Sequence, residues 1–222
     1  MNSAEQLPFE FEHRPSLSGD DFLVAPCNQV AVAWLDKWPD WSSPFLIIYG
    51  PPGCGKSHLS HVFMAKSGAM ALTSALIEDA GLANIISSAQ NFVVDDGDQD
   101  FDEEALFHIY NDLASRDGHM LITSTVSPVE WPIKLADLAS RVKAAPAAEI
   151  RQPEDDLIKA VMVKLFSDRQ VRVESGVIDY VSKRMERSLD AARQFVEAAD
   201  KAALVEKKAI TLAIARRVLA EA

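Results

Sequence analysis

Residues 45–57, which read FLIIYGPPGCGKS, decide the fold. Phe45 to Tyr49 form an unbroken apolar run, as expected for a strand buried on both faces of a parallel sheet. Gly50 to Ser57 match the phosphate-loop pattern G-x-x-x-x-G-K-[ST] at every fixed position, and a helix is expected to follow. A glycine-rich turn that matched the pattern by chance would not need a buried strand before it and a helix after it. The order of strand, loop and helix therefore predicts a nucleotide-binding α/β domain.

The chemistry of phosphate binding explains why these residue types are needed. Glycines let backbone N–H groups turn toward phosphate oxygens, and the positive end of the helix dipole adds to the attraction. Lys56 is expected to reach the β- and γ-phosphates and Ser57 to bind Mg²⁺, so the predicted cofactors are ADP or ATP with Mg²⁺. The residues expected to bind the nucleotide are Gly50, Pro51, Pro52, Gly53, Cys54, Gly55, Lys56, Ser57 and His58.

Two carboxylates follow a second apolar run downstream of the loop. Residues 91–96 read NFVVDD, so a buried strand is expected to end in Asp95 and Asp96. Asp95 is predicted to hold Mg²⁺, directly or through water, and Asp96 to orient or activate an attacking water. A solvated strand end would look the same if it stood alone, and its place downstream of a phosphate loop favours the metal site.

A third strand carries hydroxyls and is followed by a candidate arginine finger. Residues 121–125 read LITST, and Ser124 and Thr125 are candidates for sensing the γ-phosphate. Residues 137–141 read DLASR, in which Arg141 is predicted to stabilise phosphoryl charge on a nucleotide held by a neighbouring molecule. A near-copy of this string ends in Arg116, so it is the position after the third strand that favours Arg141.

The remaining pattern predicts two structured domains behind an extended tail. Strands are expected at residues 69–72, 92–94, 120–124 and 148–151, and helices at 28–37, 56–66 and 102–116, which predicts a doubly wound parallel sheet with helices on both faces. Beyond Pro153 only helical periodicity continues, with Ser188 and Thr211 as expected N-caps. The predicted divisions are a flexible tail at 1–20, an α/β domain at 21–152 and a helical lid at 153–222.

Composition limits the classes of function. The 222 residues include 33 acids and 22 bases, and a formal net charge of −11 is a poor footprint for wrapping DNA. Of the two cysteines, Cys54 lies inside the phosphate loop, where a disulfide would obstruct the backbone, so a reduced setting is expected. No secretory pattern begins the chain, and its apolar runs are far shorter than the roughly 20 residues that span a bilayer. We therefore expect a cytoplasmic protein with protein partners and no membrane association.

Several strings in order resemble the DnaA-type AAA+ ATPases and, specifically, the Hda family. They are FLV at 22–24 with Asn28 and Ala31, GPPGCGKSHL at 50–59, VVDD at 93–96, IYN at 109–111, LITS at 121–124 and DLASR at 137–141. The resemblance runs from about residue 20 to the end and implies an AAA+ fold with a small C-terminal helical lid. Residues 6–11, QLPFEF, resemble the motif by which Hda-like proteins bind the replicative sliding clamp. The expected clamp contacts are Gln6, Leu7, Phe9 and Phe11.

The resemblance also implies an activity. Hda-like proteins, bound to nucleotide and to the DNA-loaded clamp (the DNA polymerase III β subunit), stimulate ATP hydrolysis by the initiator DnaA and so prevent over-initiation. Arg141 would then act on ATP held by the initiator, and Phe22, Leu23 and Val24 would lie near the adenine. Initiators of this family end in a basic helix-turn-helix domain, whereas this chain ends at Ala222, so no direct sequence-specific DNA binding is expected.

One position departs from the superfamily. The third lid helix often supplies an arginine to the phosphates, but here the expected register places Asp190, with Arg193 about one turn further on. This departure puts efficient intrinsic hydrolysis in doubt.

The alternatives are a self-contained AAA+ ATPase, a P-loop kinase, or a nucleotide-gated adaptor such as a helicase loader. Kinases lack a separate helical lid with an arginine acting in trans. Whether ADP or ATP is the working ligand, and whether the protein forms a homo-oligomer, stay open.

Overall fold

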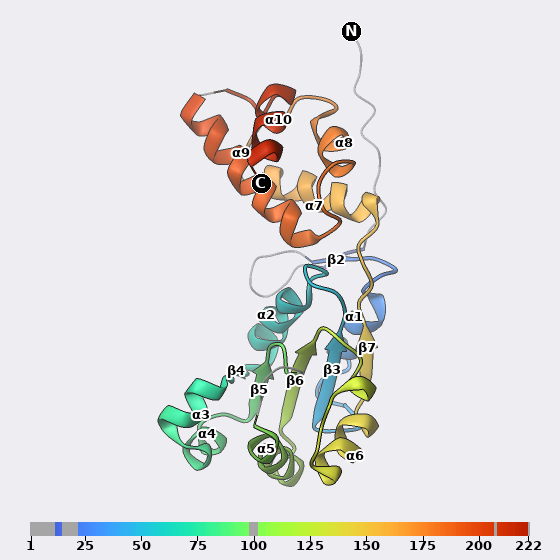
Figure 1. Cartoon of the computed structure of the whole chain (residues 1–222), viewed down its shortest axis with the longest axis vertical. Coiled ribbons are helices and arrows are strands. Elements are labelled where there is room, and N and C mark those ends of the chain that lie inside the picture. Colours follow the sequence, from blue (N-terminus) through green and yellow to red (C-terminus); the bar gives the residue numbers. More distant parts are fainter. Residues whose placement is uncertain (1–11, 15–21, 98–101, 207, 222) are drawn as a thin grey trace. The chain divides into compact units, whose positions relative to one another are not determined.

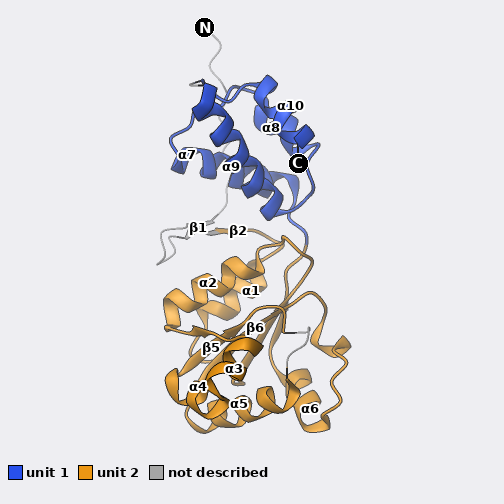
Figure 2. Cartoon of the chain, turned by 60° about the vertical axis from the view of Figure 1, so that its left-hand side comes forward, with its two compact units in different colours: residues 1–13, 152–222 blue, residues 14–151 orange. Residues whose placement is uncertain are grey.

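The computed structural model describes residues 12–14, 22–97, 102–206 and 208–221. The chain divides into two compact units (Figure 2): an α/β unit of residues 14–151, and a helical unit of residues 152–222 with which residues 1–13 are grouped. The expected clamp contacts at residues 6–11 lie outside the described residues. Among the described helices, none combines the length and apolar character needed to cross a membrane.

A five-stranded parallel sheet forms the centre of the α/β unit (Figure 1). Its strands, in spatial order, are β4 (Met70–Ala71), β5 (Asn91–Val94), β6 (His119–Ser124), β3 (Phe45–Tyr49) and β7 (Ala147–Glu149). A separate two-stranded sheet pairs β1 (Glu12–Arg14) with β2 (Phe22–Val24). The predicted parallel sheet is therefore confirmed, and β3 has the predicted bounds.

The strand order reverses at β3, and this determines where a ligand can bind. The chain leaves β3 for β4, returns through β5 and β6, and only then reaches β7 on the other side of β3. Register pairs Tyr49 with Ser124 and Val94 with Ile122, so the carboxyl ends of β3, β5 and β6 meet at one edge. Open α/β sheets bind ligands at this edge, where the order reverses. The phosphate loop follows β3 directly.

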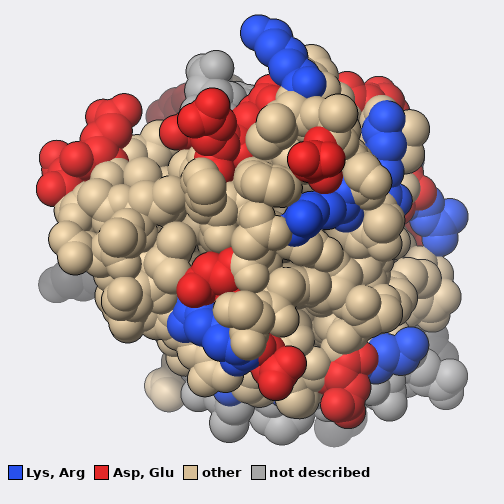
Figure 3. Space-filling view, turned by 90° about the horizontal axis from the view of Figure 1, so that it is seen from below, with Lys and Arg blue, Asp and Glu red and all other residues tan. Residues whose placement is uncertain are grey.

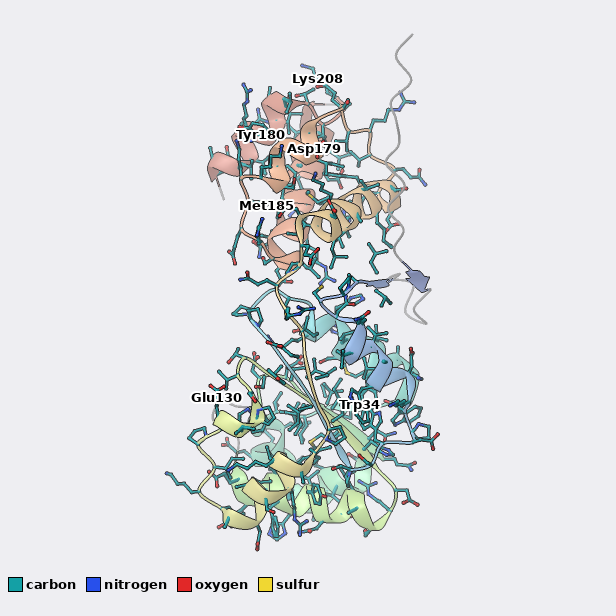
Figure 4. All side chains as sticks on the ribbon, turned by 90° about the vertical axis from the view of Figure 1, so that its right-hand side faces the viewer. Trp34, Glu130, Asp179, Tyr180, Met185 and Lys208 are labelled. Atoms are coloured by element: carbon teal, nitrogen blue, oxygen red, sulfur yellow. The ribbon has the colours of Figure 1, made fainter. Side chains whose placement is uncertain are left out.

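Alternate side chains of β3 enter two different cores, which is why the run is apolar throughout. Phe45 and Ile47 belong to one core, and Leu46 and Ile48 to the other. Helices α1 (Gln29–Asp36) and α2 (Lys56–Ser67) contribute to the second core, whereas α3 (Ser74–Ala80), α4 (Leu82–Ser88), α5 (Glu103–Ser115) and α6 (Ala136–Ala144) contribute to the first. Trp34 on α1 and Glu130 on the short 3-10 helix η1 (Pro128–Glu130) accordingly lie on opposite sides of the unit (Figure 4). The sheet is doubly wound, as predicted.

The helical unit consists of α7 (Asp155–Asp168), α8 (Val177–Ser182), α9 (Leu189–Glu206) and α10 (Leu212–Glu221) among its described residues. Ser188 Oγ accepts from the Ala191 amide at 3.0 Å, and Thr211 Oγ1 accepts from the Ile214 amide at 3.3 Å. Both predicted N-caps are confirmed, and each satisfies an amide that the first helical turn leaves unpaired.

Two short helices were not expected from the sequence. α3 and α4 lie between β4 and β5, and Gly81, with φ of 78°, ends one and begins the next. Each has seven residues, too few to show a clear 3.6-residue period. The last strand, expected at 148–151, is β7 at Ala147–Glu149, because at Arg151 the backbone amide turns to the Cys27 carbonyl, 3.0 Å away.

Candidate nucleotide site

The loop from Gly50 to Ser57 joins β3 to α2 and is built around a close backbone approach. The Gly50 amide donates to the carbonyl of Ser124 at 3.1 Å, which ties the loop to the end of β6. A Cβ atom at Gly50 would lie 2.1 Å from the carbonyl oxygen of Ile150, so only glycine fits there. Gly55, the N-cap of α2, has φ of 108°, which L side chains rarely adopt. The fixed glycines of the motif are thus explained by sterics.

Lys56 folds back across the loop. Its side chain is 7% exposed, and its ammonium donates to the carbonyls of Gly50 at 2.7 Å and Pro51 at 3.2 Å. The first amide of α2 with a carbonyl four residues back is that of Leu59, which donates to Gly55. The N-terminus of a helix that follows a glycine-rich loop and carries a lysine in its first turn is an arrangement suited to an anion. Cys54 is buried, and Ser57 is exposed at the start of the helix.

Asp95 lies at the tip of β5 and is held from two sides. Ser60 Oγ on α2 donates to Asp95 Oδ1 at 2.7 Å, and Thr123 Oγ1 on β6 donates to the same oxygen at 2.9 Å. Ser60 is one helical turn beyond Ser57, so the two predicted metal ligands belong to elements that contact each other. Neither Ser60 nor Thr123 was expected from the sequence to have a role.

Thr123, rather than Ser124, is the residue of β6 whose hydroxyl faces the acids. Its Oγ1 accepts from the Asp96 amide at 3.1 Å, which fixes the backbone of Asp96 at φ of 52°. Ser124 is fully buried and used locally, because its hydroxyl bonds the backbone of Val126 and accepts from Trp131 Nε1 at 3.2 Å. The expectation that Ser124 senses the γ-phosphate is not supported by these contacts.

Arg141, on α6, is docked on α5. Its guanidinium donates to Asn111 Oδ1 and lies 4.7 Å from the ring centroid of Phe107 and 4.6 Å from that of Tyr110. Phe107, Tyr110 and Asn111 follow one another at helical spacing, so they form one face of α5. The arginine is therefore presented in a defined orientation, half-buried, on the opposite face of the sheet from α2.

A carboxylate fixes the segment that leads into α6. Glu103 accepts from the amide of Leu135 at 2.7 Å and from that of Lys134 at 3.1 Å. These backbone N–H groups, Lys134 first, lower the pKa of the Glu103 carboxyl below its usual value. The start of α5 and the start of α6 are thereby joined. Figure 3 views the structure from below Figure 1, the side on which α5 and α6 lie. Basic and acidic side chains are interspersed on that face rather than separated by sign.

The remaining predicted contacts are distributed between the two units. Leu23 is buried, and its carbonyl accepts from Asn28 Nδ2 at 3.0 Å, while Val24 packs against the core to which α1 and α2 contribute. Arg193, in the helical unit, is exposed, with its Nη1 4.0 Å from Asp190 Oδ1. The acid that the sequence placed at the phosphate-contacting position thus forms a long ion pair with the neighbouring arginine.

A parallel sheet with a phosphate loop at its switch point, acids at the end of β5 and a separate helical unit defines an AAA+ nucleotide-binding fold. No family model matches the chain. DnaA of Flavobacterium psychrophilum is 21% identical over 239 residues, covering 96% of this chain and 50% of its own length. Domain III of DnaA from Thermotoga maritima superposes with a TM-score of 0.78 at 20% identity, covering 90% of this chain and 94% of that one. DnaA from Aquifex aeolicus, with AMPPCP bound, superposes with a TM-score of 0.67 at 19% identity, covering 84% and 65%.

The chain has an AAA+ fold and is similar in sequence to DnaA proteins. It spans about half the length of the curated relatives it matches.

Proposed function

We propose that this protein is a nucleotide-bound regulator of chromosome replication that stimulates ATP hydrolysis by the initiator DnaA. The observation that carries the proposal is the docking of Arg141 on α5. A guanidinium held by Asn111 and two aromatic rings is preorganised to stabilise negative charge on a phosphate group bound by another molecule. α6 and α2 lie on opposite faces of the sheet, so Arg141 is suited to a nucleotide held by another molecule.

The protein's own nucleotide is proposed to bind at the loop after β3. The Lys56 ammonium and the first amides of α2 would hold the phosphates of ADP or ATP, while Ser57 and Asp95 would hold Mg²⁺, which neutralises phosphate charge when bound. Support comes from the glycine geometry, from the acid at the tip of β5 that bonds Ser60 on α2, and from the AMPPCP bound by the Aquifex DnaA. Phe22, Leu23 and Val24 are proposed to lie near the base, and Arg193 is proposed as the nucleotide-binding residue of the lid.

In the proposed reaction, the chain supplies charge and position rather than a covalent step. The Arg141 guanidinium would donate to oxygens of the γ-phosphoryl group on the initiator, where negative charge has to be stabilised in the transition state. Phe107 and Tyr110 keep its plane oriented, and Asn111 takes one of its N–H donors. Because the arginine is ordered beforehand, less conformational entropy is lost when the partner docks.

The proposed partners are the initiator and the DNA-loaded sliding clamp in the cytoplasm. Gln6, Leu7, Phe9 and Phe11 would contact the clamp, so that the chain acts only where replication is under way. This part rests on the sequence motif alone.

The decisive experiment measures turnover of initiator-bound ATP with this protein and DNA-loaded clamp. Arg141→Ala should lower the stimulated rate of ATP hydrolysis roughly 10³-fold or more, which is the usual contribution of such an arginine. Nucleotide binding to this protein should stay intact. Arg116→Ala is the matched control, since Arg116 ends the same Leu-Ala-Ser-Arg string but bonds the Ala89 carbonyl and Asp112 within its own unit. Deleting residues 1–12 should abolish clamp binding and, with it, the stimulation that the clamp adds. Full stimulation by Arg141→Ala would refute the finger assignment.

A self-contained ATPase is the second candidate, favoured by the two acids that Thr123 holds in place. Under this alternative Asp96 would activate water for hydrolysis in the protein's own site. Multiple turnover of ATP without initiator or clamp, lost in Asp96→Asn but retained in Arg141→Ala, would favour it over the regulatory function.

A further inference from the structure

Two hydroxyl groups that the phosphate-loop motif does not include converge on one oxygen of Asp95. Ser60 Oγ lies 2.7 Å and Thr123 Oγ1 2.9 Å from Asp95 Oδ1. The exposed fractions of Ser60 and Thr123 are 0% and 1%, whereas the Asp95 side chain is exposed at the strand tip. The buried donors therefore reach outward to a carboxylate that itself faces solvent.

This arrangement leaves the carboxylate with one engaged and one available oxygen. No described residue donates to Asp95 Oδ2, and Asp95 also lines a cavity of about 220 Å³ beside α2 and the start of α3. Here its second oxygen is kept in reach of solvent while the first is fixed by two donors.

Thr123 additionally controls the backbone of the next acid. Its hydroxyl has one proton, which goes to Asp95, so it can only accept from the Asp96 amide 3.1 Å away. The Gly97 amide donates to the Thr123 carbonyl at 2.8 Å, and a Cβ at Gly97 would lie 2.4 Å from Ile122 Cγ2. The turn of residues 95–97 is thus fastened to β6 and has little freedom to move.

We propose that Ser60 and Thr123 are positioning residues for Asp95 and that they set the Mg²⁺ dependence of nucleotide binding. The inference rests on the proposed nucleotide site, but on neither the initiator nor the clamp. Groups that orient a metal ligand without touching the metal commonly change metal affinity by 10- to 100-fold when removed. Ser60 links this effect to α2, whose first turn carries Lys56 and Ser57, so the phosphate loop and the metal ligand are held as one unit.

The test compares nucleotide affinity across a Mg²⁺ series. The affinity of the full chain for ADP is measured by calorimetry from EDTA to saturating Mg²⁺ in Ser60→Ala and Thr123→Val, of which the second keeps the shape of the side chain and removes its hydroxyl. In each variant, the Mg²⁺ concentration that gives half of the maximal increase in ADP affinity should be about tenfold higher than in the wild type. The affinity for ADP in EDTA should be unchanged. Thr123→Ser keeps the hydroxyl and should behave as the wild type.

Ser67→Ala is the matched control, because it removes a hydroxyl from the far end of α2, where Ser67 bonds the Phe63 carbonyl. Its Mg²⁺ dependence should equal that of the wild type. The inference is overturned if folded Ser60→Ala keeps the wild-type Mg²⁺ dependence, or if it loses affinity equally in EDTA. If Thr123→Val does not fold, the result for Ser60→Ala alone decides whether the inference holds. Wild-type protein that binds Mg²⁺ and ADP but fails to stimulate the initiator would refute the proposed function and leave this inference standing, whereas no nucleotide binding at all would overturn both.

Discussion

The docking of Arg141 allows a graded prediction, because its two kinds of contact can be removed separately. Asn111→Ala removes the oxygen that accepts from the guanidinium, and Phe107→Leu removes a ring whose centroid lies 4.7 Å from it. Tyr110 is a less suitable site, since its ring also packs edge-on against Phe45 at 4.8 Å and its loss would disturb the core.

The magnitudes follow from the chemistry of each contact. A hydrogen bond to a charged group contributes about 1.5–3 kcal/mol, and a cation–π contact at a partly exposed site about 0.5–1 kcal/mol. If the docked guanidinium is the one that acts, Asn111→Ala should slow initiator-bound ATP hydrolysis roughly 10- to 150-fold, and Phe107→Leu roughly 2- to 5-fold. Both should remain faster than Arg141→Ala, which lacks the charge itself.

Single-turnover hydrolysis of ATP on the initiator, with DNA-loaded clamp at saturation, measures this order. Tyr180→Leu is the control, since it removes a comparable contact, the Arg184 guanidinium 3.9 Å from the Tyr180 ring, in the helical unit. It should leave the rate unchanged. A wild-type rate in Asn111→Ala, or a larger loss in Phe107→Leu than in Asn111→Ala, would refute the idea that the docked arginine is the active one.

Three further outcomes test the fold of the α/β unit. Gly50→Ala should lose nucleotide binding and about 1–3 kcal/mol of unfolding free energy, because its Cβ would meet the Ile150 carbonyl oxygen at 2.1 Å. Gly68→Ala is the control, since nothing lies within 4 Å of its Cβ. Urea unfolding should show a loss of only about 1 kcal/mol for Gly68→Ala, caused by the φ of 65°. Burial lowers the pKa of His119, so the unfolded state gains the proton first. Stability by urea unfolding should fall as the pH drops below 6.5, and His119→Gln should flatten that slope. Glu103→Gln should lower the thermal midpoint at neutral pH. Backbone donors lower the Glu103 pKa, so this difference should disappear as the pH falls below 4.5.

The architecture could be predicted because the central strands β3, β5 and β6 are buried on both faces and the phosphate loop has an obligatory sequence. Phe45 to Tyr49 are apolar at every position since two cores share the strand, and that pattern is visible without any partner. The N-caps at Ser188 and Thr211 were equally local, because each hydroxyl accepts from an amide three residues away. α3 and α4 were missed since their packing against the sheet, rather than any periodicity of their own, stabilises them.

The acids of the site could be predicted from the sequence, and the groups that orient them could not. Asp95 follows an apolar run and is visible in the sequence, but Ser60 lies 35 and Thr123 28 positions away from it. Thr123 comes beside Asp95 only because the parallel register pairs Val94 with Ile122, and a shift of one residue would have turned the Thr123 side chain to the other face of the sheet. Sequence inspection favoured Ser124 and Thr125 because they end the strand, yet Thr123 is the residue whose hydroxyl bonds Asp95 and the Asp96 amide. Strand register therefore identifies the orienting residue once the pairing of β5 and β6 is known. Val94, the last buried residue of β5, pairs with Ile122, and the residue after Ile122 is Thr123, which bonds Asp95.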